Sequence, residues 1–198
     1  MNAVESMKEI LKKITSAREG KSDLNFIASR IQNMDDEKYN YIIYRLTKQI
    51  EIVKKYNPKV RPAIDPMVSS ELGVYSGLDF PEEYGILMGY PKCCVESFKS
   101  ARFGIDAEHL KEAEEIKDGI KKDILENNKD VKEKVAIIMP SGFIPCSLKC
   151  EEAWKRNLIN IISYEEHLII QELEAELLNA LPHFHGAYNE YYEKILLL

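Results

Sequence analysis

The sequence predicts a mainly α-helical protein with one or a few short β-strands, an α+β arrangement in which the β part is minor and the body is compact and helical. Segments 4–17 and 35–56 repeat apolar residues at helical spacing, and a polar, charged helix follows at 106–127. The only good strand candidate is 134–139, in KVAIIMP. One strand cannot form a sheet alone, so we expect short β pieces near residues 60 and 86 to pair with it.

The N-terminal part is predicted to be three helices. In segment 4–17 apolar side chains lie on one face, with Lys and Glu on the other, and Gly20 ends the pattern. A second helix is expected over 24–33, with Asp23 as its N-cap. The third, over 35–56, begins with acidic and ends with basic residues, as the helix dipole favours.

The segment 57–82 changes in character. Its four prolines exclude a long helix, although one helical turn fits within 69–78. We interpret it as a packed connector, because it carries apolar residues that need burial: Val60, Ile64, Val68, Leu72 and Leu78. The chain is therefore expected to divide into an N-terminal helical segment, 1–56, and a cysteine-bearing body, 57–198.

Composition limits the class of protein. The net charge of -6 argues mildly against broad nonspecific nucleic-acid binding, and no pattern strongly indicates it. No apolar run approaches the ~18–20 residues of a membrane span, and the N-terminus lacks the apolar core of a secretory signal. We expect a cytoplasmic protein without a membrane partner, whose thiols stay reduced.

All four cysteines fall in two tight pairs, Cys93 with Cys94 and Cys146 with Cys150. Each pair follows a proline, a residue that suits the start of a helix. The second pair is expected to open a long helix over 147–180, with both thiols on one face. The positive end of a helix dipole stabilises a thiolate, which is the form that binds metals and acts as a nucleophile.

Two expectations complete the chain. His109, in the acid-rich helix 106–127, is expected to be solvated. The last residues, in NEYYEKILLL, are expected to form another helix after an interruption at PHFHGAY.

Three interpretations of the cysteines stay open. In the first, Cys93, Cys94, Cys146 and Cys150 bind zinc or an iron–sulfur cluster, and the larger cluster suits adjacent cysteines better. In the second, the pairs exchange disulfides or carry sulfur. In the third, they are structural, as buried thiols or as disulfides. The first predicts that sulfurs of the two pairs lie within about 8 Å of one another. The residues identify no reaction, so enzyme activity stays undecided.

The motifs GYPKCCVESF and IPCSLKCEEA, with VRPAIDP, LGVYSGL and ARFGID, resemble an uncharacterised prokaryotic and archaeal domain family over about residues 50–160. This family implies no settled activity. More loosely, the chain resembles the methanogen adaptor proteins of tRNA-dependent cysteine synthesis. That resemblance implies a non-catalytic adaptor that bridges phosphoseryl-tRNA synthetase and Sep-tRNA:Cys-tRNA synthase. Its docking helix would be 4–17, with the anchors Val4, Met7, Ile10, Leu11 and Ile14. The alternative, that this helix packs on its own domain, stays open.

Overall fold

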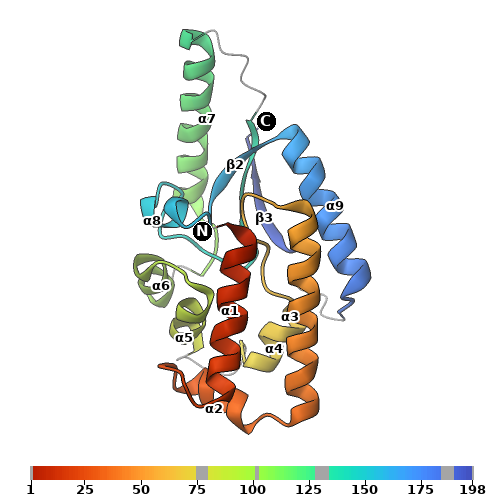
Figure 1. Cartoon of the computed structure of the whole chain (residues 1–198). Helices are drawn as coiled ribbons and strands as arrows, with labels where there is room; N and C mark the ends of the chain where they lie inside the picture. The colour runs from red at the N-terminus through yellow and green to blue at the C-terminus, as the bar shows by residue number, and fades with distance from the viewer. Residues whose placement is uncertain (1, 75–79, 101–102, 128–133, 184–189, 198) are drawn as a thin grey trace.

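The computed structural model describes residues 2–74, 80–100, 103–127, 134–183 and 190–197. The described elements are α1 (Ala3–Arg18), α2 (Phe26–Asn33), α3 (Asp36–Tyr56), α4 (Pro66–Leu72), α5 (Phe80–Met88), α6 (Lys92–Lys99), α7 (Ala107–Asn127), β1 (Lys134–Pro140), α8 (Glu151–Lys155), β2 (Asn160–Ser163), α9 (Tyr164–Ala180) and β3 (Tyr192–Leu196). Helices surround one small antiparallel sheet, and α7 extends beyond it (Figure 1). The predicted fold class, mainly α with a few short strands, is confirmed.

The three N-terminal helices form where the sequence predicts them, but the cap of α2 differs from the prediction. Asn2 and Glu5 form a capping box at α1, and Asp35 accepts a hydrogen bond from an N–H group of the first turn of α3. The expected cap of α2, Asp23, is wrong. The carboxylate of Glu83, on α5, accepts hydrogen bonds from three successive N–H groups at the start of α2 instead. This contact fixes α2 against α5.

The sheet separates two apolar cores. β1 is the central strand and pairs antiparallel with β2 on one side and β3 on the other. Successive side chains of a strand point to opposite faces. Ala136 and Ile138 accordingly pack into the larger core with α1, α2, α3 and α9, whereas Ile137 and Met139 face a smaller core near α7 and α8. The expected pairing of β1 with pieces near residues 60 and 86 is therefore wrong.

The C-terminal half contains two strands where the sequence predicts helix. The expected long helix over 147–180 is divided into α8, β2 and α9. Asn157, with φ of 53°, ends α8 in the left-handed region, and a capping box between Ser163 and Glu166 begins α9. The expected terminal helix is β3, which pairs with β1 over five residues and is held to α9 by Glu174.

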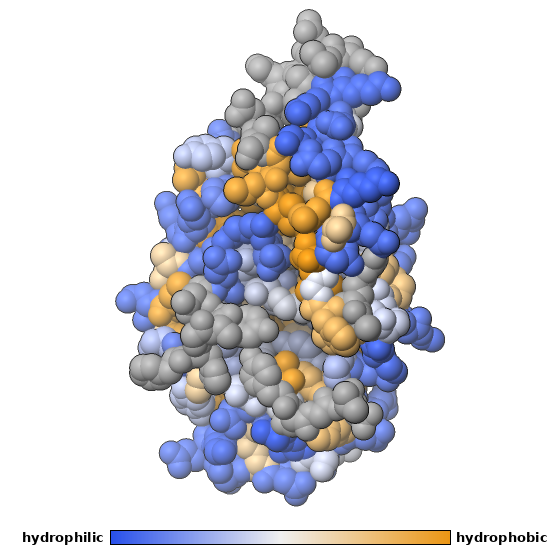
Figure 2. All heavy atoms as spheres, turned by 180° about the vertical axis from the view of Figure 1, so that it is seen from behind, coloured by the Kyte–Doolittle hydropathy of each residue, from blue (hydrophilic) through white to orange (hydrophobic). Residues whose placement is uncertain are grey.

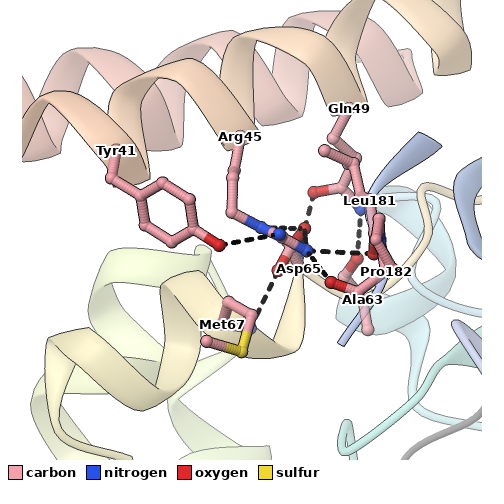
Figure 3. A network of polar contacts seen from close by, with 8 residues as sticks. All are labelled: Tyr41, Arg45, Gln49, Ala63, Asp65, Met67, Leu181 and Pro182. Carbon is pink, nitrogen blue, oxygen red and sulfur yellow. Dashed lines mark hydrogen bonds and ion pairs between the residues drawn. The ribbon is translucent and has the colours of Figure 1, made fainter. Parts of the chain in front are cut away.

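A buried ion pair joins the segment after α3 to the rest of the body. Figure 3 shows Arg45, on α3, pointing toward Asp65, whose carboxylate lies 2.9 Å away and is fully buried. Asp65 also accepts a hydrogen bond from the Met67 N–H group and so caps α4. The Arg45 guanidinium reaches the carbonyl oxygens of Leu181 and Pro182 beyond α9. The connector is thus packed, as expected; Leu78 lies outside the described residues.

The surface carries both hydrophilic and apolar areas. Seen from behind, the side of the molecule along α7 is hydrophilic, and an apolar area lies beside it (Figure 2). α7 belongs to the smaller core through Ala113, Ile116 and Ile120. No helix in the described ranges combines the length and the apolar character that crossing a membrane requires.

Candidate metal centre

The two cysteine pairs meet at one place. The sulfur atoms of Cys93, Cys94, Cys146 and Cys150 all lie within 4.8 Å of one another, and no disulfide joins them. Three contacts are resolved: Cys93 to Cys150 at 3.7 Å, Cys94 to Cys146 at 3.8 Å and Cys94 to Cys150 at 3.8 Å. The predicted convergence of the pairs is confirmed. That they bind a metal stays a prediction.

The first pair lies in the first turn of α6, where the sequence places it. Pro91 is the N-cap, and its carbonyl oxygen accepts hydrogen bonds from the N–H groups of Cys94 and Val95. Cys93 is exposed and Cys94 is buried. The positive end of the α6 dipole therefore lies beside both sulfur atoms.

The second pair lies on a loop rather than on one helical face, which corrects the sequence prediction. Cys146 belongs to the segment between β1 and α8, and Cys150 is the N-cap of α8. The fully buried side chain of Leu148, between the two cysteines, anchors the loop in the smaller core. Its carbonyl oxygen accepts a 2.7 Å hydrogen bond from the Trp154 indole N–H group.

α7 holds this loop through side chains that the sequence analysis did not assign to the site. His109 is fully buried, not solvated as expected, and its Nε2 lies 2.8 Å from the carbonyl oxygen of Pro145. Because a carbonyl oxygen only accepts, Nε2 carries the proton in this contact. The Glu112 carboxylate accepts hydrogen bonds from the Ser147 hydroxyl and the Leu148 N–H group, both at 2.7 Å. These bonds fix the backbone on both sides of Cys146.

The thiols differ in their electrostatic surroundings. Burial is the largest cause that raises the pKa of Cys94, and burial likewise raises the pKa of Cys146, to about 11. At Cys150, burial acts in the same direction but is outweighed by hydrogen bonds from the Ala153 N–H group and the neighbouring thiols, so its pKa is lowered. Without a cation, Cys94 and Cys146 therefore stay protonated at neutral pH and are poor nucleophiles.

A bound cation would reverse this preference, because metal ligation requires and stabilises thiolates. The site already contains part of the support for a thiolate. The Cys146 N–H group donates a 3.5 Å hydrogen bond to the Cys94 sulfur. The four sulfurs, the charge-stabilising N–H donors and the rigid loop therefore suit a soft metal ion that prefers thiolate ligands.

The proposed docking residues lie elsewhere. Met7, Ile10 and Ile14 are buried in the larger core, and Val4 and Leu11 pack against it. α1 lies beside α2, α3 and α5 rather than apart from the body. A partner that used these anchors would have to displace α1 from its own core. Partner binding itself stays a prediction.

Comparisons with known proteins place the chain among archaeal relatives. Residues 46–178 match the model of a family described as "Protein of unknown function (DUF483)". An uncharacterized protein of Methanocaldococcus jannaschii is 50% identical over 96% of this chain and 99% of its own length. Another, of Methanothermobacter thermautotrophicus, is 54% identical over 83% of each chain. No solved structure matches.

Proposed function

This chain belongs to the DUF483 family, and we propose that it is a zinc-binding protein in which one ion, held by Cys93, Cys94, Cys146 and Cys150, fixes α6 to the loop before α8. The observation that carries the proposal is the spacing of the sulfurs. In a tetrahedral site with metal–sulfur bonds of about 2.3 Å, neighbouring sulfurs are about 3.8 Å apart. The three resolved contacts are 3.7 and 3.8 Å.

The same spacing favours a single ion over an iron–sulfur cluster. In a four-iron cluster each cysteine binds a different iron, so the sulfurs are separated by the metal–metal distance in addition to the bonds. Here all four sulfurs fit within 4.8 Å, which leaves room for one ion at their centre. Adjacent cysteines were expected to suit a cluster better. In the structure, the first turn of α6 brings Cys93 and Cys94 to the same centre.

The geometry supports a structural role for the ion. Four protein ligands complete the coordination of tetrahedral zinc and leave no position for a substrate. The ligands come from segments that are more than fifty residues apart in sequence, as the 56-residue separation of Cys94 and Cys150 shows. A bound ion would therefore close a long loop and hold α5 and α6 against the smaller core. This role requires reduced thiols, as in the cytoplasm where we expect the protein to reside.

The experiment is a metal measurement on the full chain, purified without oxygen. We expect about one zinc ion per chain by plasma mass spectrometry. The double variant C146S/C150S should lose the metal, because a hydroxyl is a poor ligand for a soft cation. E151Q is a matched control in the first turn of α8, since the exposed side chain of Glu151 pairs with Lys155 and does not belong to the four-sulfur set.

Substitution of cobalt for zinc supplies the second measurement. Tetrahedral thiolate cobalt absorbs strongly in the visible range, and E151Q should retain that spectrum whereas C146S/C150S should not. Zinc content unchanged in C146S/C150S would overturn the proposal. A brown protein with stoichiometric iron and sulfide would replace the single ion with a cluster.

A further inference from the structure

A second site lies beside the thiols. A cavity of about 450 Å³ opens between α4, α5, α6 and the turn that follows β1, and Cys94 contributes to its wall. Its volume lies within the range of pockets that enclose small organic molecules, about 300–1,000 Å³. Of the four cysteines of the metal site, Cys94 alone belongs to the described lining of the cavity.

The lining is rich in aromatic rings. Six of them face the cavity: Phe80, Tyr84, Tyr90, Phe98, Phe103 and Phe143. Several support one another, since Phe80 stacks on Tyr84 with ring centroids 5.0 Å apart and Tyr90 lies 4.7 Å from Phe143. Arg61 already lies against the Tyr90 ring, at 5.6 Å from its centroid. Such walls offer apolar contact area and the negative faces of π-systems.

The charge of the lining has one sign. Glu190 and Glu193 are the acidic residues of the described lining, which contains no Lys, Arg or His. Within the described ranges neither carboxylate has a hydrogen bond or an ion pair. The adjacent cation, Lys194, is bound by Glu174 instead.

Glu193 lies in a partly buried position, where an ionised carboxylate without a partner is unfavourable. It lies on β3 opposite Met139, a residue of the smaller core, and is only partly exposed. Burial raises its pKa, and the charge of Glu190 adds to this effect. A partly desolvated carboxylate without a partner is stabilised when a cation binds to it.

We propose that this cavity binds a small organic cation, whose aromatic or apolar body packs among the rings and whose ammonium group binds Glu190 and Glu193. The cavity supplies the two components of amine recognition in one place, aromatic faces and paired carboxylates. This inference goes beyond the zinc site. It depends on the position of α6 and not on which metal holds α6 there.

The test compares three probes of one shape on the metal-loaded full chain: phenethylamine, phenethyl alcohol and hydrocinnamate. Methyl NMR reports the site directly, because Ile64, Val95 and Ile144 line the cavity. We expect phenethylamine to shift these methyl resonances in a saturable way, the alcohol to bind about tenfold more weakly and the anion not to bind. Equal binding of the amine and the alcohol, or no shift with the amine, would overturn the proposal.

Two variants assign the charge. E193Q keeps the shape of the side chain and should weaken phenethylamine about tenfold while binding of the alcohol is unchanged. E172Q, on the exposed face of α9, is the matched control and should bind both probes as the native chain does. Thermal melts of both variants establish that they fold.

Metal content, measured on the same samples, separates the two proposals. Zinc at one equivalent with no amine binding would refute the cavity proposal alone. Amine binding by a chain that contains no metal would refute the zinc proposal alone.

Discussion

The substitution Gly85→Ala tests whether the position of α6 controls the metal site. Gly85 is buried where α5 packs against α6. A Cβ atom placed there would lie 2.5 Å from Cγ2 of Val95, 3.5 Å from its Cγ1 and 3.6 Å from its Cβ. Val95 directly follows Cys94, so relief of this clash moves the first cysteine pair.

The magnitude follows from these distances. Carbon atoms in ordinary contact are about 3.5–4.0 Å apart, so Val95 must move by about 1 Å or more. A valine in a helix has one strongly preferred rotamer, and rotation alone is therefore a poor remedy. Metal–ligand distances tolerate only about 0.2 Å of change. We expect G85A to lose about 1–3 kcal/mol of stability and to bind zinc at least about tenfold more weakly.

The assay is competition for zinc with a chromophoric chelator, together with thermal unfolding in the presence and absence of the metal. Val95→Ala removes the clashing Cγ2 together with Cγ1 and leaves the 3.6 Å contact, so G85A/V95A should regain the zinc affinity of V95A. Gly119→Ala is the control, because a Cβ there meets nothing within 4 Å. Native zinc affinity in G85A, or no recovery in the double variant, would show that the position of α6 does not control the metal site.

Three further predictions concern the supports of the fold and the site. The three N–H donors hold the pKa of Glu83 below its usual value, against the opposing effect of burial, so the ionised carboxylate stabilises the fold above the unfolded glutamate pKa of about 4.3 and this stabilisation is lost as the pH falls through the lowered value. E83Q should lose about 1 kcal/mol of unfolding free energy in urea at neutral pH. A difference between E83Q and the native chain that persists in acid would contradict this. Asp65→Ala should cost about 3–5 kcal/mol in urea unfolding because it leaves Arg45 buried and unpaired, and R45M/D65A should recover part of that loss, so strictly additive costs would count against a coupled pair. Glu112→Gln should accelerate zinc release to a chelator by about tenfold, whereas E114Q on the outer face of α7 should not, and equal rates would show that Glu112 does not position the loop.

The helices that local sequence specifies were predictable. α1 and α3 have apolar faces at helical spacing and acidic or polar residues at their starts, and α7 continues the same kind of pattern. β1 is a short apolar run that both cores cover. The meeting of the two cysteine pairs was also predictable, because two thiol pairs at proline-led turns have few reasons to occur apart.

The strands that need distant partners were not predictable. The local sequence of β3 predicts a helix, and the segment forms a strand because β1 offers it an edge with which to pair. The division of 147–180 did leave local signs, since Asn157 favours a left-handed ending and Ser163 with Glu166 forms a capping box.

The residues that hold the cysteine loop carried no local sign at all. His109 contacts Pro145 across 36 residues of sequence, and Glu112 contacts Leu148 across the same separation. On the sequence alone, both belong to a charged helix that is typical of a solvated surface. Only the packing of α7 against the smaller core brings them to the site.

X-ray absorption at the zinc edge, on the full chain purified without oxygen and without added metal, identifies the atoms that bind the ion. We expect stoichiometric zinc with a single shell of about four sulfur atoms at about 2.3 Å and no metal–metal scattering. A chain that carries no zinc, a shell dominated by nitrogen or oxygen, or an iron signal with metal–metal scattering would contradict it.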